Sequence, residues 1–246
     1  MEIFNNNYKV TQKTPFKGIP FNKSTTYIQE AFEFAYDMSF GGKGKHRSHR
    51  SGGQENRKNG QIFVDTFQGK LAELGFYNTF KKNGFDISYP DFETYDLGLW
   101  DSADFEVKKD TKTFLFSIKS TKFYGDLMLL ETKDFNKHGE YIPNKQKDKC
   151  KYDIFALVRI KPDAEAILKS KKQLYSNTID KEKLKNMILN ENWEYDLPGY
   201  IRNEDLVQII NSKQIIPQNA TLNNYTKMDA ENYFIETGEM IKFKIT

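Results

Sequence analysis

An almost uninterrupted apolar run, KYDIFALVRI at residues 151–160, limits the possible folds more than any other stretch of this chain. A strand that carries apolar side chains toward both faces needs cover on both sides, which is typical of a central, buried strand. The run ends at Lys161, Pro162 and Asp163, which have the chemistry of a turn. We therefore predict a sheet that has this segment in its interior.

Length and composition indicate a folded protein with one main core. The chain has 246 residues, a length that suits one sizeable domain with a subdomain. Only 38% of the residues are hydrophobic, but 15% are aromatic, so bulky rings supply much of the burial and argue against disorder. The net charge of +3 is too small to identify a nucleic-acid partner by itself.

Cysteine usage and hydropathy bear on the compartment. The single cysteine, Cys150, cannot form an internal disulfide. The sequence shows neither a charged and then apolar leader nor an apolar run of about 18 residues. We therefore expect a cytoplasmic protein without a membrane segment.

A basic segment separates two predicted helices in the first third of the chain. Apolar residues at helical spacing predict a helix within residues 25–40. Residues 41–60 then carry six Lys or Arg against one Glu and have almost no apolar residue, which predicts a loop or arm. This arm would either follow DNA phosphates or be a solvated loop. Its basic residues are Lys43, Lys45, Arg47, Arg50, Arg57 and Lys58.

The clearest helical pattern runs from Gln61 to Gly84, where glycine is expected to end the helix. Glu73 lies beside its apolar stripe, and Gly69, one turn earlier, leaves space next to that carboxylate. The stripe consists of Phe63, Phe67, Leu71, Leu74 and Asn78. Further along, AEAILKSKKQL and IDKEKLKNMIL predict helices, and the alternating EMIKFKI predicts a strand.

The stretch ADFEVKKDTKTFLFSIKSTK, residues 103–122, predicts a hairpin. A turn centred between Asp110 and Thr111 places Asp104 opposite Ser117, with Lys119 two residues further on the same face. A carboxylate, a hydroxyl and an ammonium then share one patch of the sheet, away from the apolar face. Such a patch suits either a divalent cation with a phosphate or an ordinary ion pair on an exposed face.

The order of these features resembles the core of the PD-(D/E)XK nuclease superfamily over about residues 61–160. The segment QGKLAELGFYNTFKKNGF is similar to the first helix of that core, ADFEV to its acid strand, and FSIKSTK to its lysine strand. The resemblance implies an α/β fold with a mixed central sheet flanked by helices, and elaborations at both ends. One nuclease domain would then have an N-terminal helix and arm (1–60), a catalytic core (61–160) and a C-terminal subdomain (161–246) for DNA contact or dimerisation.

The resemblance also implies roles for individual residues. Asp104 becomes the central metal ligand, Lys119 the catalytic lysine, and Glu73 a helix carboxylate of the same site. Ser117 departs from the family pattern, because the family places Asp or Glu two residues before the lysine. We expect Glu73 to replace the missing acid, with Glu131 as the second choice. Asp91, although it belongs to a literal Pro-Asp pair, does not fit the register and ranks lower than Asp104.

Within the superfamily, the whole chain most resembles a type II restriction endonuclease. This implies Mg²⁺-dependent hydrolysis of double-stranded DNA, a homodimer, and a DNA methyltransferase as functional companion. Lys122 would be either a second phosphate contact or a surface lysine. The alternatives are a non-catalytic nucleic-acid-binding protein with a degenerate nuclease core, and a repair or recombination nuclease. A carboxylate at metal distance from Asp104 would separate the enzyme from the non-catalytic protein.

Overall fold

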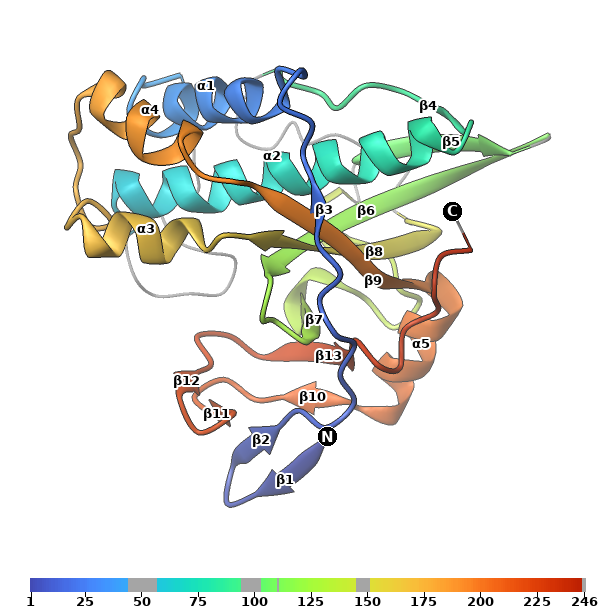
Figure 1. Cartoon of the computed structure of the whole chain (residues 1–246). Coiled ribbons are helices and arrows are strands. Elements are labelled where there is room, and N and C mark those ends of the chain that lie inside the picture. Colours follow the sequence, from blue (N-terminus) through green and yellow to red (C-terminus); the bar gives the residue numbers. More distant parts are fainter. Residues whose placement is uncertain (44–56, 94–102, 110, 145–150, 245–246) are drawn as a thin grey trace.

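A six-stranded mixed sheet forms the centre of the molecule (Figure 1). The computed structural model describes residues 1–43, 57–93, 103–109, 111–144 and 151–244. Neighbouring strands of the sheet are antiparallel except β6 and β8, which are parallel. Across the sheet the order is β3 (Ile19–Pro20), β9 (Glu194–Arg202), β8 (Ile154–Lys161), β6 (Lys112–Lys122), β5 (Phe105–Lys109) and β4 (Asp86–Ile87).

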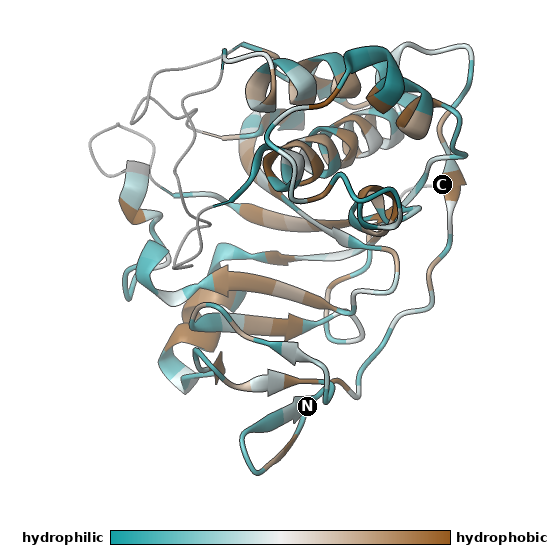
Figure 2. Cartoon of the chain, turned by 90° about the vertical axis from the view of Figure 1, so that its left-hand side faces the viewer, coloured by the Kyte–Doolittle hydropathy of each residue, from teal (hydrophilic) through white to brown (hydrophobic). Residues whose placement is uncertain are grey.

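Four helices cover one face of this sheet, and a fifth helix lies beyond the other face with two smaller sheets (Figures 1 and 2). The covering helices are α1 (Tyr27–Ser39), α2 (Asn59–Lys82), α3 (Ala164–Ser170) and α4 (Lys181–Leu189). On the other side lie α5 (Asn203–Ser212) and a sheet of β10 (Ile215–Ile216), β13 (Asn232–Glu236) and β7 (Leu127–Glu131). The third sheet contains β1 (Glu2–Phe4), β2 (Asn7–Lys9), β11 (Thr221–Leu222) and β12 (Thr226–Lys227). Short 3-10 turns are found at Thr132–Asp134 and Ile142–Asn144.

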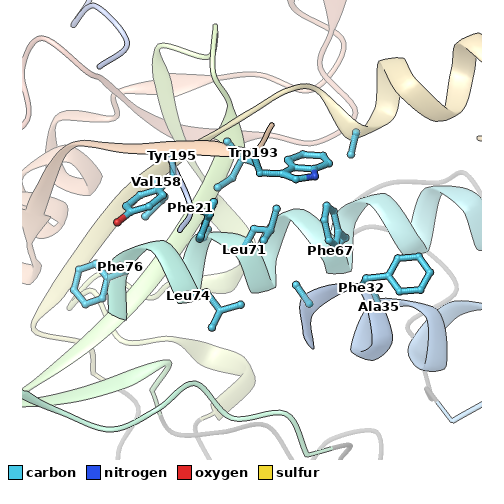
Figure 3. Close-up of a cluster of buried hydrophobic side chains, with 14 of the residues drawn as sticks. Phe21, Phe32, Ala35, Phe67, Leu71, Leu74, Phe76, Val158, Trp193 and Tyr195 are labelled. Atoms are coloured by element: carbon cyan, nitrogen blue, oxygen red, sulfur yellow. The ribbon is translucent and has the colours of Figure 1, made fainter. Parts of the chain in front are cut away.

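Helix α2 is the main support of the sheet. Its aromatic and aliphatic side chains pack toward the sheet, with Phe67 beside Trp193 (Figure 3). Phe76 also lies close to Phe105 of β5. The positions of the predicted stripe are all buried. Gly75 lets the helix approach Tyr195 closely, because a Cβ there would lie 2.7 Å from the ring. The helix is therefore held in a fixed position over β5 and β6.

A second apolar cluster covers the opposite face of the sheet. It joins Phe155 and Leu157 of β8 to Met128 and Leu130 of β7 and to α5. Strand β8 is thus covered on both sides, as its apolar run predicts. None of the helices in the described residues is long and apolar enough to cross a membrane.

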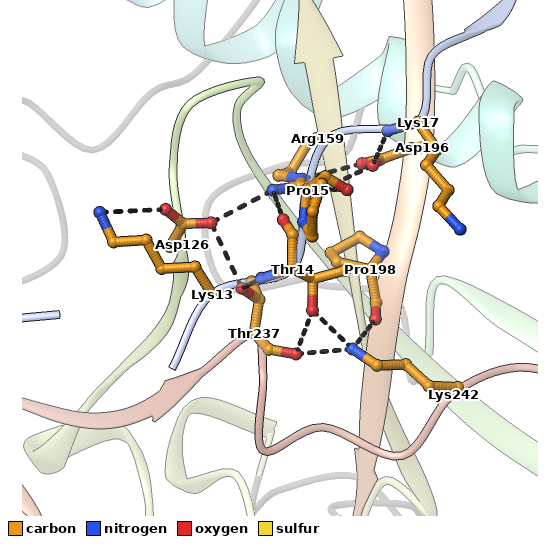
Figure 4. A network of polar contacts seen from close by, with 10 residues as sticks. All are labelled: Lys13, Thr14, Pro15, Lys17, Asp126, Arg159, Asp196, Pro198, Thr237 and Lys242. Carbon is orange, nitrogen blue, oxygen red and sulfur yellow. Dashed lines mark hydrogen bonds and ion pairs between the residues drawn. The ribbon is translucent and has the colours of Figure 1, made fainter. Parts of the chain in front are cut away.

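A buried ion cluster joins the N-terminal segment to the sheet (Figure 4). Arg159 of β8, 1% exposed, forms two hydrogen bonds to Asp196 of β9, at 2.9 and 2.6 Å. Its other N–H groups donate to Asp126 and to the carbonyl oxygens of Thr14 and Pro15. This cluster and strand β3 fix the first twenty residues to the central sheet.

The structure confirms the mixed central sheet with helices on its faces and the predictions for the longer segments. The predicted helices correspond to α1, α2, α3 and α4, and Gly84 follows α2 in a left-handed conformation at φ +80°. The hairpin has the predicted register, with Phe105 paired to Phe116. The prediction of a strand at EMIKFKI is wrong for its described part, where only one isolated bridge forms, between Ile241 and Tyr200. Of its alternating apolar residues, Ile241 is exposed and Phe243 is partly buried against the rings of Phe80 and Tyr200.

Candidate active site

Asp104 lies at the point where β5 begins beside β6. Its backbone N–H donates to the Phe116 carbonyl at 3.0 Å, and its carboxylate accepts from the Ile118 N–H at 2.5 Å. Continuation of the register places it opposite Ser117, as predicted. Because one carboxylate oxygen is held by the strand and the side chain is exposed, the group is both positioned and accessible.

Glu73 approaches this point from α2. Its side chain is only 18% exposed. Burial raises the pKa of Glu73 to about 7, the nearby Lys70 ammonium opposes this rise, and the negative charges of Asp104 and Asp91 add to it. The structure therefore brings Glu73, the first choice for the missing acid, into the electrostatic reach of Asp104.

Lys70 and Asp91 also belong to this site, although the sequence pattern did not assign them to it. The Lys70 Nζ lies 2.7 Å from Glu73 Oε2 and donates to the Asp91 carbonyl oxygen at 2.5 Å. The spacing of Lys70 and Glu73 at i and i+3 on one helix is the signal that could have indicated their pairing. Asp91 comes to the site through the segment after β4 and not through the hairpin register.

Lys119 and Ser117 lie on the face of β6 that is turned away from α2. Phe116 and Ser120 define the α2 side, because Phe116 packs against Phe76 and Ser120 accepts a hydrogen bond from Gln68. By strand alternation, Ser117 and Lys119 project to the other face. Ser117 is 2% exposed, whereas Lys119 is half-buried and has no ion-pair partner within the described part of the chain. Lys119 and Glu73 therefore belong to opposite faces of the sheet. Asp104, at the start of β5, is opposite Ser117 in the register, and its charge still acts on Glu73.

Glu131, the second choice for the missing acid, belongs to a different sheet. It lies at the end of β7, paired with Asn232 of β13. Burial raises its pKa to about 7, and its charged neighbours are Asp134, Lys133 and Asp229. Because these neighbours lie outside the hairpin, Glu131 is tied to its own local cluster and not to Asp104.

The described members of the predicted DNA-binding set are partly engaged with acids. Lys43 pairs with Asp37 at 2.7 Å, and Arg57 with Asp65 at 3.1 Å. Lys58 is exposed at the start of α2. The remaining arm residues, Lys45, Arg47 and Arg50, lie outside the described residues.

Lys122 contacts two carboxylates, Glu165 at 2.7 Å and Asp163 at 3.2 Å. Although burial opposes protonation, a hydrogen bond to Glu165 and the charges of Asp163 and Glu165 raise its pKa. This pairing favours a structural role over a phosphate contact, because the two acids would repel a phosphate.

Comparisons of the chain with protein-family models, with curated proteins and with solved structures give no match. The function must therefore be argued from the chemistry of the site itself.

The carboxylates near Asp104 suit a hard divalent cation such as Mg²⁺. In the described residues, no group of three or more His, Cys, Asp or Glu side chains is arranged to hold a metal. Magnesium, however, commonly binds through one or two carboxylates and keeps water and substrate phosphate oxygens as its other ligands. Glu73 and Asp104 supply two such carboxylates, and a divalent cation would offset both the burial of the Glu73 charge and its repulsion by Asp104.

Proposed function

We propose that the chain is a Mg²⁺-dependent endonuclease that hydrolyses phosphodiester bonds of double-stranded DNA at specific sequences, in the manner of a type II restriction endonuclease. The observation that carries this proposal is the exposed Asp104 carboxylate, which the Ile118 N–H holds at the start of β5, together with the Glu73 carboxylate of α2, whose pKa Asp104 helps to raise. Two carboxylates that repel each other at a strand end, one of them exposed, are a suitable binding site for a hard cation.

Each residue has a chemical role in this proposal. Asp104 and Glu73 would hold the magnesium ion, and the ion would supply positive charge at the scissile phosphate and Lewis acidity for activation of the attacking water. The water oxygen forms a bond to phosphorus, the bond from phosphorus to the 3′ oxygen breaks, and that oxygen leaves as a hydroxyl after gaining a proton. Lys119 has an ammonium that could stabilise the negative charge of this step once DNA is bound.

A second candidate is a non-catalytic nucleic-acid-binding protein that keeps the same core. Two observations favour it: the described residues contain no group of three metal-ligating side chains, and Lys119 lies on the sheet face opposite α2. The homodimer and the companion methyltransferase depend only on the resemblance to restriction endonucleases. Cleavage without sequence preference would instead favour a repair or recombination nuclease.

The test is incubation of the purified protein with phage and genomic DNA in the presence of Mg²⁺. Discrete fragments are expected, and they should disappear when the metal is chelated. Asp104→Asn should reduce cleavage by at least ~100-fold but leave DNA binding intact, because the amide oxygen still accepts from Ile118.

Glu106→Gln is the matched control for Asp104→Asn, since Glu106 is an exposed acid two residues further along β5. It should cleave as well as the wild-type protein. Full activity of the Asp104→Asn variant would remove Asp104 from the site. Intact DNA across metals and salt concentrations, together with DNA binding, would favour the non-catalytic protein.

A further inference from the structure

Lys70 is the most constrained lysine near the candidate site. Its ammonium lies 5.0 Å from the ring centre of Phe34 in α1 and 5.3 Å from that of Phe92. The two rings are perpendicular to each other, with centres 5.6 Å apart. Because an ammonium is attracted to the faces of aromatic rings, and more strongly when water is excluded, the Lys70 side chain is held in one position. Only 13% of it is exposed.

The contacts of Lys70 join three segments around Glu73: α1, α2 and the segment after β4. One N–H group donates to Glu73 Oε2 and another to the Asp91 carbonyl, at 2.7 and 2.5 Å. The first bond fixes the carboxylate of α2, and the second fixes the segment after β4. Through its aromatic contacts, the same ammonium also joins α1 to this arrangement.

These contacts indicate that Lys70 orients neighbouring groups and does not bind the substrate directly. An ammonium that is enclosed by two rings and hydrogen-bonded to two oxygens has little capacity left for a phosphate. Resting on the proposed nuclease function, we propose that Lys70 is a positioning residue that holds the Glu73 carboxylate in the orientation in which, together with Asp104, it binds the catalytic magnesium ion.

The test compares Lys70→Met with Lys70→Arg. Methionine keeps an unbranched chain between the two rings but removes the ammonium, whereas arginine keeps the charge. Since groups that orient metal ligands commonly affect metal affinity by ~10 to 100-fold, Lys70→Met should raise the Mg²⁺ concentration for half-maximal cleavage by that factor. At saturating Mg²⁺ the rate should recover to within a few-fold of wild type, and Lys70→Arg should lie between the two proteins.

Lys181→Met is the matched control. Lys181 pairs with Glu33 at 2.6 Å and lies 4.9 Å from the ring centre of Tyr36, so its contacts are of the same kind but away from the site. This variant should leave the Mg²⁺ dependence unchanged. In a Glu73→Gln background, Lys70→Met should cause no further loss. An equal loss with and without Glu73 would overturn the inference.

A readout without catalysis separates the failure of this inference from the failure of the proposed function. Mn²⁺ titration followed by calorimetry measures metal affinity even if no DNA is cut, and Lys70→Met should weaken it by the same ~10 to 100-fold. A crystal structure of the variant should show the Glu73 carboxylate in a changed orientation. If Glu73 stays in place and Mn²⁺ affinity is unchanged, Lys70 is not a positioning residue. If Lys70→Met does not fold, Lys70→Gln replaces it in each of these experiments.

Discussion

Two groups of charged residues in this molecule, the Arg159 cluster and the candidate site, differ in how their charges are paired. In the Arg159 cluster, all five guanidinium N–H donors have acceptors, and the carboxylates of Asp196 and Asp126 are matched by Arg159 and Lys13. At the candidate site, burial and the charges of Asp104 and Asp91 raise the pKa of Glu73, and the Lys70 ammonium opposes this rise. In the first group both carboxylates lie within ion-pair distance of a cation, whereas in the second the carboxylates act on one another as like charges.

The difference shows how a structural ion cluster can be separated from a candidate site. Burial alone does not separate them, because Arg159 is more deeply buried than Glu73. Repulsion between like charges does separate them, since it lowers the stability of the free protein and is relieved by a ligand of the opposite sign. Mutation of a cluster with paired charges should therefore lower the free energy of unfolding. Mutation at a site where like charges repel should instead lower activity.

The largest effect is expected from Arg159→Met, which leaves Asp196 buried without its partner. Removal of one member of a buried ion pair commonly lowers the free energy of unfolding by ~3 to 5 kcal/mol. Urea denaturation measures this change, and cleavage per folded molecule should stay the same. As a control, the double variant Arg159→Met/Asp196→Leu should recover part of the loss because no unpaired charge remains. A loss below ~1 kcal/mol for the single variant would contradict the role of the cluster.

A smaller free-energy effect is expected from Glu73→Gln, and it should appear in the rate of cleavage and not in the free energy of unfolding. Removal of one charged group that stabilises the reaction should slow cleavage by ~100 to 1,000-fold, which is about 3 to 4 kcal/mol of the barrier. The unfolding free energy should not fall, because the substitution removes a repelled carboxylate. Initial cleavage rates and urea denaturation on the same preparation provide the two measurements. A loss of stability without a loss of activity would show that Glu73 has a structural role, like the residues of the Arg159 cluster.

The smallest effect is a pH dependence of stability. The pKa of Glu73 is 4.5 in the unfolded chain and about 7 in the folded one. Below pH 4.5 both states hold the proton, and between the two values only the folded state does. Stability should therefore fall as pH rises through this window, by up to ~3 kcal/mol from Glu73 alone, and then level off.

Glu73→Gln should remove this part of the slope, and added Mg²⁺ should reduce it in the wild-type protein. Glu131→Gln is the comparison variant, because the pKa of Glu131 is also raised to about 7 by burial but in a separate cluster. It should remove its own share of the slope without changing the response to Mg²⁺. An identical Mg²⁺ response in the Glu73→Gln variant would argue against a metal ion at Glu73.

Features with a regular period were predictable from the sequence. The stripe of α2, the register of the hairpin and the apolar run of β8 all express local rules of side-chain spacing. The short strands β10 and β11 have two residues each and pair with segments outside their local sequence, β13 and β2. No local pattern specifies such strands.

The positions of the candidate site residues were predictable in part. The register places Asp104 opposite Ser117, and the helical pattern places Glu73 beside the α2 stripe, whereas their assignment to one site came from the resemblance and stays a prediction. Lys70 and Asp91 were not predictable in this way, because their roles depend on how α1 and the segment after β4 pack around α2. The expectation that Lys119 shares a face with Ser117 agrees with strand alternation, but alternation alone does not tell on which face the helix lies.

The attachment of the N-terminal segment has a consequence for the order of folding. Asn7, Val10 and Thr14 form hydrogen bonds with Asn224, Asn223 and Thr237, contacts that span 217, 213 and 223 residues of the chain. Closing such large loops is slow, and the partners do not exist until the ribosome has made most of the protein. We therefore expect the first residues to be synthesised first but to find their places last, after the central sheet has assembled without them.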